Sequence, residues 1–154
     1  MGTTWLWCLQ EFAISDTKQT ILLVGTGLIG TSLGMALRKS GRYLVTGLSR
    51  TSRSLLIAKR KGAIDRSATL ADIQSADVVV LCTPIDQMGR VLKKLLPNLK
   101  RGAIITDVGS VKHTVEQTIQ SLIRKHARQN IVYVGAHPMA GSHETGPEAA
   151  RVNL

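Results

Sequence analysis

Short runs of apolar residues alternate with amphipathic stretches along most of this chain. The runs are rich in Val, Ile and Leu, which is typical of buried strands, whereas the stretches between them repeat apolar residues at helical spacing. The runs predict strands at residues 20–24, 43–48, 63–66, 77–82, 103–106 and 131–134. The amphipathic stretches predict helices at residues 28–39, 52–61, 70–75, 86–96 and 111–128.

Strands and helices that alternate in this way indicate an α/β fold. Because the strands are apolar throughout, helices must cover both faces of the sheet, which favours a doubly wound, mainly parallel sheet. At 154 residues the chain can bury one core but is too short for two ordinary domains. We therefore predict one domain over residues 20–154 and interpret residues 1–19 as a loosely ordered N-terminal extension without chemistry.

A glycine-rich loop follows the first predicted strand, at the kind of strand end where parallel sheets bind ligands. It reads GTGLIG and opens a helix, the context in which this pattern binds a dinucleotide in a Rossmann-type fold. In that role Gly25 permits the tight turn, Gly27 lets backbone amides approach the pyrophosphate, and Gly30 permits close packing of helix on strand. The alternative is a structural turn without a ligand. The predicted cofactor-binding residues of the loop are Gly25, Thr26, Gly27, Leu28, Ile29 and Gly30.

The residues after the second strand, Ser49, Arg50 and Thr51, bear on the choice of cofactor. An NAD site usually has an Asp or Glu here to hold the 2′-hydroxyl of the ribose, and this sequence has neither. Two hydroxyls and a guanidinium suit a 2′-phosphate instead, because arginine binds phosphate through paired hydrogen bonds. We therefore expect NADP to be preferred over NAD, with an ordinary surface role for Arg50 as the alternative.

Three later strand ends carry further candidates. After the fourth strand, Thr83 and Pro84 turn the chain beside the glycine loop, where their backbone can contact a ribose of the cofactor. After the fifth, Ser110 and Lys112 offer a hydroxyl and a cation to an anionic substrate, but a serine there is equally suited to cap the following helix. After the sixth, His137 can accept a proton near neutral pH, and the alternative is a structural histidine.

The net charge of +10 raises the question of nucleic acid. The basic pairs fall in the last turns of predicted helices, where cations complement the helix dipole. Aromatic residues, which stack on bases, make up 3% of the chain, so we expect attraction of small anions rather than nucleic acid. No apolar run is long enough to cross a membrane. The cysteines, Cys8 and Cys82, indicate neither a disulfide framework nor a metal site, so a cytoplasmic protein without metal is expected.

Several of these motifs occur together in one family. GTGLIGTSLG, LCTPI, DVGSVK and GAHPMAGSHETG resemble, over residues 21–154, the prephenate and arogenate dehydrogenases of tyrosine biosynthesis. The resemblance implies oxidative decarboxylation of prephenate or arogenate, with hydride passing from the ring carbon that bears the hydroxyl to the nicotinamide. It implies that His137 is the catalytic histidine that accepts the hydroxyl's hydrogen bond or proton, that Ser110 orients both groups, and that Lys112 supports substrate binding. The SRT sequence after the second strand is similar to that of NADP-using arogenate dehydrogenases.

Two features depart from that family. His143 lies just beyond HPMAG, where some members carry an acid implicated in substrate choice, so it is a further candidate for substrate binding and the choice between prephenate and arogenate stays open. The chain ends at Leu154, whereas the family continues into a helical domain that forms a homodimer and contacts the substrate carboxylates. The expectation is therefore cofactor binding with little or no turnover. The alternatives are a non-catalytic dinucleotide-binding fragment and another NADP-dependent dehydrogenase of the same fold.

Overall fold

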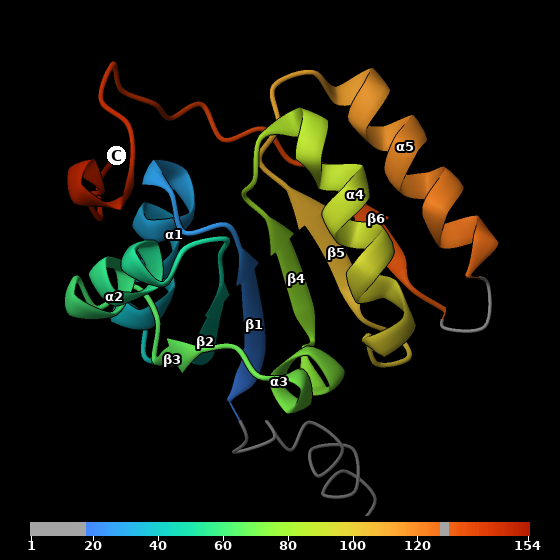
Figure 1. Ribbon diagram of the computed structural model, residues 1–154, viewed down its shortest axis with the longest axis horizontal. Helices are drawn as coiled ribbons and strands as arrows, with labels where there is room; N and C mark the ends of the chain where they lie inside the picture. Colours follow the sequence, from blue (N-terminus) through green and yellow to red (C-terminus); the bar gives the residue numbers. More distant parts are fainter. Residues whose placement is uncertain (1–17, 127–129) are drawn as a thin grey trace, which may run out of the picture.

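The computed structural model describes residues 18–126 and 130–154, and its strands form one sheet. The strands are β1 (Gln19–Val24), β2 (Tyr43–Leu48), β3 (Arg66–Ser67), β4 (Val78–Leu81), β5 (Ile104–Asp107) and β6 (Val132–Val134). All neighbouring pairs are parallel, in the order β3-β2-β1-β4-β5-β6 (Figure 1). The direction of the winding reverses between β1 and β4, and the carboxyl ends of the strands at such a reversal are where ligands bind.

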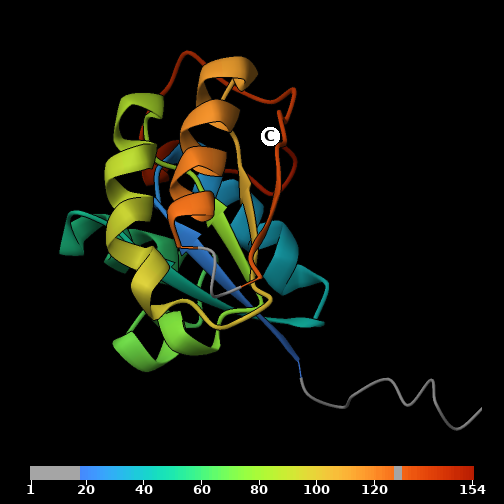
Figure 2. The ribbon, with the colours of Figure 1, turned by 90° about the vertical axis from the view of Figure 1, so that its right-hand side faces the viewer.

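Helices cover both faces of this sheet. The α-helices among the described residues are α1 (Leu28–Lys39), α2 (Ser52–Arg60), α3 (Leu70–Ser75), α4 (Ile85–Leu95) and α5 (Lys112–Lys125). Two short 3-10 helices are η1 (Leu96–Asn98) and η3 (Pro147–Ala149). In Figure 2, α4 and α5 lie on one side of the sheet and α1 lies on the other. This is the doubly wound, Rossmann-type arrangement that the sequence predicts.

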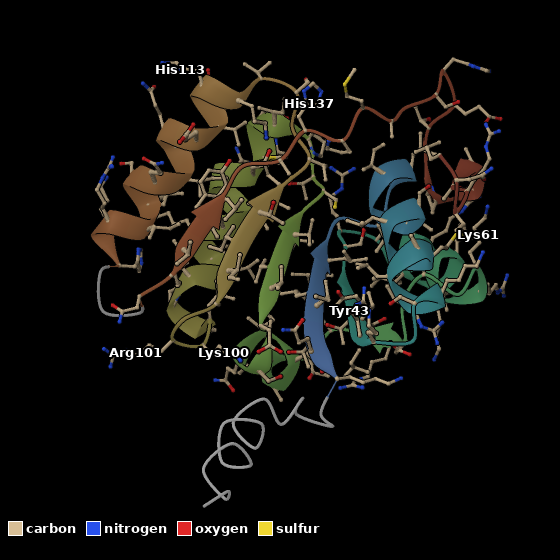
Figure 3. The ribbon with its side chains drawn as sticks, turned by 180° about the vertical axis from the view of Figure 1, so that it is seen from behind. Tyr43, Lys61, Lys100, Arg101, His113 and His137 are labelled. Atoms are coloured by element: carbon tan, nitrogen blue, oxygen red, sulfur yellow. The ribbon has the colours of Figure 1, made fainter. Side chains whose placement is uncertain are left out.

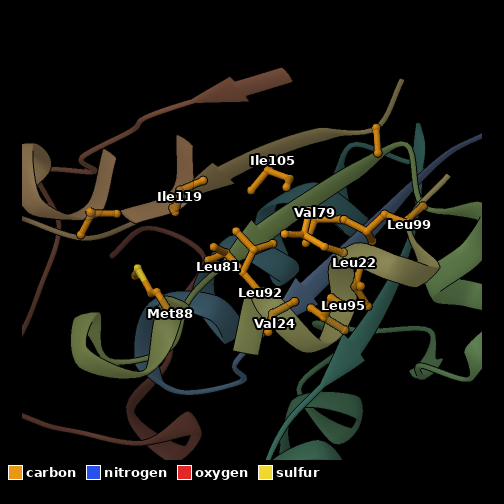
Figure 4. Packing of buried hydrophobic residues seen from close by; sticks show 14 residues of the cluster. Leu22, Val24, Val79, Leu81, Met88, Leu92, Leu95, Leu99, Ile105 and Ile119 are labelled. Atoms are coloured by element: carbon orange, nitrogen blue, oxygen red, sulfur yellow. The ribbon is translucent and has the colours of Figure 1, made fainter. Parts of the chain in front are cut away.

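The central strand β1 is buried on both faces. Leu22 and Leu23 are each 0% exposed, although neighbouring residues of a strand point to opposite sides. Leu22 packs in a cluster with Leu92 of α4 and Ile119 of α5 (Figure 4). Leu23 packs in a second cluster with Ala58 of α2. Each face of the sheet therefore has its own core, and the two cores together hold the strand ends that build the site.

The predicted third strand is wrong in its position. The prediction places it at residues 63–66, whereas the strand is Arg66–Ser67. Ala63 and Ile64 are almost fully buried, but they belong to the turn that follows α2 and pack in the core beneath it. The apolar character of these residues reflects their burial. A short apolar run does not show whether its residues are buried in a turn or paired in a sheet.

The other elements agree closely with the prediction. The bounds of α1, β2 and α3 are as predicted, and the remaining bounds differ by one residue, apart from the end of α5, which is Lys125. Gln19, assigned to the N-terminal extension, belongs to β1; residues 1–17 of that extension, and the predicted end of the last helix at Arg128, lie outside the described residues. The basic residues do lie in the last turns of α1, α2 and α5: Arg38, Lys39, Lys59, Arg60, Arg124 and Lys125. In the part of the chain that the structure describes, no helix is both long and apolar enough to cross a membrane.

After β6 the chain crosses the carboxyl edge of the sheet and returns to α1 and α2 (Figure 1). Residues 135–146 are named here the crossing segment. Its far end leads into η3, where Lys61 Nζ donates hydrogen bonds to the carbonyl oxygens of Glu148, at 2.5 Å, and of Ala150, at 2.9 Å. The crossing segment therefore runs along the strand ends at which a ligand of this fold binds.

Candidate functional site

The glycine loop combines two closed positions with one open position. Gly25 has φ +106°, and a Cβ on it would lie 2.6 Å from the carbonyl oxygen of Cys82. A Cβ on Gly30 would lie 2.0 Å from the carbonyl oxygen of Gly25. A Cβ on Gly27, by contrast, would meet nothing within 4 Å. The loop is thus tightly packed on the sheet side, while the space over Gly27 is free.

Gly27 is also the N-cap of α1. No side chain within residues 18–126 or 130–154 caps this helix, and its first turn contains no acidic residue. The amides of a helix's first turn have no partner within the helix, and the helix dipole adds positive potential at this end. The free space over Gly27 therefore suits a phosphate group.

A cleft of about 460 Å³ extends from this helix start along the ends of β4 and β5 to the crossing segment. It brings together predicted residues from four separate stretches of the sequence. The predicted residues that line it are Gly27, Leu28, Ile29, Thr83, Pro84, Ser110 and His137. The predicted residues that do not line it are Gly25, Thr26, Gly30, Ser49, Arg50, Thr51, Lys112 and His143.

Thr83 contributes a polar atom that has no hydrogen-bond partner among the described residues. Its Oγ1 is buried and makes no hydrogen bond to any described residue; the same holds for Thr26 Oγ1 in the glycine loop. A buried hydroxyl without a partner is costly, so each such atom calls for an explanation. Because Thr83 lines the cleft, a polar ligand there would supply the missing partner.

Cys82 also lines the cleft, directly after β4. Burial, together with the negative charge of Asp107, raises the pKa of its thiol to about 12. The thiol is therefore protonated at neutral pH and is not a nucleophile, since the thiolate is the reactive form. Its side chain packs against the second core cluster.

The end of β2 lies on the side of β1 away from β4 and β5, whose ends line the cleft. Thr51 is the N-cap of α2, and its hydroxyl accepts a hydrogen bond from the Ser54 N–H at 3.4 Å. Arg50 is exposed, and Ser49 is partly buried. An acid does reach this helix, but from a distant part of the chain: Glu148 pairs with Arg53 of α2 at 3.4 Å, both side chains being well exposed.

At the end of β5 the structure shows a buried acid that the sequence reasoning missed. Asp107 is 0% exposed. Its carboxylate accepts hydrogen bonds from the Gly109 N–H at 2.7 Å, from Lys112 Nζ at 2.5 Å and from the Tyr133 hydroxyl at 2.7 Å. Burial and the hydrogen bond to Asp107 both raise the pKa of Tyr133, which stays protonated as a donor. A buried charge needs such partners, and the DVGSVK motif could have suggested the contact to Lys112.

Ser110 is exposed and lines the cleft. The alternative role as a helix cap is wrong: Val111 is the N-cap of α5, and no side chain caps that helix. The Ser110 hydroxyl is therefore not used to stabilise the helix end and is available to a ligand.

His137 lies at the start of the crossing segment, at the edge of the sheet opposite to Lys100 and Arg101 (Figure 3). It is exposed and lines the cleft, as Ser110 does. His143 is exposed but does not line the cleft, whereas its neighbour Glu144 does. One end of the cleft thus offers a place for phosphate, and the other offers a hydroxyl and an imidazole that can orient a substrate and accept a proton.

Known proteins share both sequence and fold with this chain. Residues 33–154 match the family described as "Prephenate dehydrogenase, nucleotide-binding domain". The chain is 35% identical over 137 residues to the prephenate dehydrogenase of Lactococcus lactis, a match that covers 87% of this chain and 38% of that enzyme.

Two solved structures are similar as well. The arogenate dehydrogenase of Synechocystis superimposes with a TM-score of 0.76 at 34% identity, covering 86% of this chain and 45% of that one. The prephenate dehydrogenase of Aquifex aeolicus, in complex with hydroxyphenyl propionate and NAD+, gives a TM-score of 0.76 at 31% identity, covering 90% and 48%. The chain therefore spans less than half the length of each of these relatives.

Proposed function

This chain belongs to the prephenate dehydrogenase family as its nucleotide-binding domain, and we propose that it holds a nicotinamide dinucleotide in the cleft for the oxidative decarboxylation of prephenate or arogenate. One observation carries the proposal: the same cleft is lined by Gly27 at the start of α1 and by Ser110 and His137 from the ends of β5 and β6. A cofactor that extends from Gly27 to Ser110 and His137 connects a phosphate site to the groups that act on the substrate.

The described residues fit such a cofactor. The free space over Gly27 accepts the pyrophosphate next to the first amides of α1. Thr83 Oγ1, which is buried and has no partner in the described part of the chain, offers a hydrogen bond to a ribose hydroxyl, and Pro84 turns the chain beside it.

When bound, the oxidised nicotinamide supplies the hydride acceptor. The residues of this chain orient the substrate and handle one proton. An imidazole nitrogen of His137 accepts the proton of the ring hydroxyl while the hydride leaves the ring carbon that bears this hydroxyl. Ser110 orients the hydroxyl toward His137. As carbon dioxide departs, the electron pair of the broken carbon–carbon bond enters the ring. The ring becomes aromatic, and the proton returns from His137 to the phenol oxygen.

The substrate is tested by nuclear magnetic resonance on the isotope-labelled chain saturated with NADP+. Prephenate and arogenate are added in turn, and phenylpyruvate, which lacks the ring hydroxyl, is the matched control. We expect one or both substrates to shift the resonances of Ser110 and His137, and phenylpyruvate to leave them in place. Equal shifts with phenylpyruvate would contradict the assignment of these two residues and would favour a non-catalytic dinucleotide-binding fragment.

We further propose that NADP is preferred over NAD, with Ser49 and Arg50 on the 2′-phosphate. The support is the residue types at the end of β2, where no carboxylate follows the strand, and the exposure of Arg50. Glu148 lies near α2, where its carboxylate pairs with Arg53 at 3.4 Å.

Calorimetric titration with NADPH and NADH tests this preference. Arg50→Ala should weaken NADPH binding by about tenfold, the loss of one charge-assisted hydrogen-bonded contact, while NADH binding stays within about twofold. Arg60→Ala, at the exposed other end of α2, is the control for loss of a positive charge. Tighter binding of NADH than of NADPH by the unaltered chain would overturn the preference and leave the dinucleotide site itself intact.

A further inference from the structure

Lys112 contacts the crossing segment as well as the buried acid Asp107. Its Nζ donates a hydrogen bond to the carbonyl oxygen of Ala136, the residue directly before His137. The preceding Gly135 packs over the same group of side chains: a Cβ there would lie 3.1 Å from the Tyr133 hydroxyl and 3.7 Å from Lys112 Cδ. The start of the crossing segment therefore rests on Lys112 and Tyr133, the two side chains that Asp107 holds.

Few other contacts fix this part of the chain. Among the residues that the structure describes, the bond from Lys112 to Ala136 is the only hydrogen bond that ties residues 135–141 to the rest of the domain. Within the same described part, the imidazole of His137 makes no hydrogen bond, and Met139 beyond it is 99% exposed. The place of His137 at the cleft thus depends on the attachment at Ala136.

Asp107 makes this attachment firm. Lys112 alone is a long, flexible side chain with a large rotamer entropy, and holding it in one conformation is costly. The fully buried carboxylate of Asp107 holds its ammonium at 2.5 Å and is itself fixed by the Gly109 N–H and the Tyr133 hydroxyl. Lys112 does not line the cleft, so its charge is directed into the domain rather than toward a ligand.

We infer that Lys112 is a positioning residue: with Asp107 and Tyr133 it fastens the carbonyl of Ala136 to the end of β5 and so sets His137 at the cleft, instead of contacting the substrate. The inference rests on the proposed function only for the role of His137. The fastening itself is a property of the chain without cofactor or substrate.

The inference is tested on the isotope-labelled chain without ligands. In Lys112→Met, the backbone order parameters of Ala136 and His137 should fall below about 0.6, the range of flexible backbone, and the imidazole resonance of His137 should move toward that of an unstructured histidine. The imidazole of His126, at the other end of α5, and the amide of Gly27 should not change. Lys125→Met, an exposed lysine in the last turn of α5, is the matched control, and Lys112→Arg should restore most of the native His137 signal because arginine keeps the cation and its donors.

Two results would overturn the inference. One is a folded Lys112→Met protein in which the His137 resonance and the backbone order parameter of Ala136 are unchanged. The other is a uniform change in which Gly27 and His126 shift as much as His137, since this would make Lys112 a general stabilising residue. If Lys112→Met does not fold, Tyr133→Phe decides, because it removes only the hydroxyl that fixes Asp107: a smaller shift of His137 supports the inference and no shift overturns it.

The outcome is separate from that of the proposed function. Failure of NADPH to bind would remove the cofactor assignment without affecting how Ala136 is held. Conversely, NADPH can bind at Gly27 whether or not Lys112 positions His137.

Discussion

At the scale of single residues, the glycines of the loop divide into those that close space and one that leaves it open. Gly25 and Gly30 face backbone atoms at distances that exclude any side chain. Gly27 faces free space, and its φ of −81° is one that any residue adopts. The fold therefore explains glycine at positions 25 and 30, whereas only a ligand that approaches the backbone explains it at position 27.

This difference predicts opposite results for two alanine substitutions. Gly27→Ala should leave the free energy of unfolding within about 0.5 kcal/mol of the unaltered chain, as at an unconstrained surface position, while NADPH affinity falls by about tenfold or more. Gly30→Ala should lower the free energy of unfolding by about 1–3 kcal/mol, because its Cβ forces the loop off the helix. Chemical denaturation and calorimetry measure the two quantities. Unchanged NADPH affinity in a folded Gly27→Ala protein would contradict the placement of the pyrophosphate.

Residues of the site were predictable from the sequence where their position directly after a strand was enough to place them at the cleft. Thr83, Ser110 and His137 follow predicted strands, and parallel strands bring their carboxyl ends to one edge, so all three line one cleft. Asp107 and Tyr133 were not predictable, because their contact joins residues that are 26 apart in the chain. It depends on the pairing of β5 with β6 and on the direction of two side chains, and neither follows from a hydrophobic pattern.

At the scale of elements, polar contacts at the start of β4 join it to its neighbours. The carboxylate of Asp77 accepts hydrogen bonds from the N–H and the hydroxyl of Thr20 in β1, at 2.7 and 2.8 Å, and pairs with Lys100 before β5. Burial alone would raise the pKa of Asp77, but the hydrogen bonds from Lys100 and Thr20 outweigh it and hold the pKa below its ordinary value. This contact fastens the three central strands at the edge opposite to the site.

The lowered pKa predicts how stability depends on pH. A carboxyl group whose pKa is lower in the folded than in the unfolded state stabilises the fold above the unfolded value, about 3.9, and loses this contribution as the pH falls through the folded value. Asp77→Asn should therefore lower the free energy of unfolding by about 1 kcal/mol at neutral pH, and the difference should shrink below about pH 4. Denaturation at a series of pH values measures it, with Asp86→Asn on α4 as the control for loss of one negative charge. A difference that stays constant down to about pH 2 would contradict the account of Asp77.

Helices and strands were predictable from the sequence where an apolar run also pairs in the sheet. The glycine loop and the apolar runs place β1, α1, β2 and β4 correctly. The third strand fails because Ala63 and Ile64 lie in a turn that packs on the face of the sheet, whereas a strand would pair in it. Burial and strand pairing leave the same apolar signal over so few residues.

At the scale of the whole molecule, the crossing segment joins the two halves of the sheet. It carries His137 over the strand ends from β6, and it returns to α1 and α2 where Lys61 holds the carbonyls of Glu148 and Ala150. The pair of Glu148 with Arg53 spans 95 residues of sequence, so the acid near the start of α2 could not be predicted. The family assignment, by contrast, followed from the motifs in order, and the matching domain family confirms it.

The central claim is that one dinucleotide occupies the cleft from Gly27 to His137. The most direct measurement is a crystal structure of this chain with NADPH. The account predicts the pyrophosphate on the first amides of α1, a ribose hydroxyl within hydrogen-bond distance of Thr83 Oγ1, and the nicotinamide beside Ser110 and His137. A cofactor bound away from Gly27, or with its nicotinamide remote from His137, would contradict it.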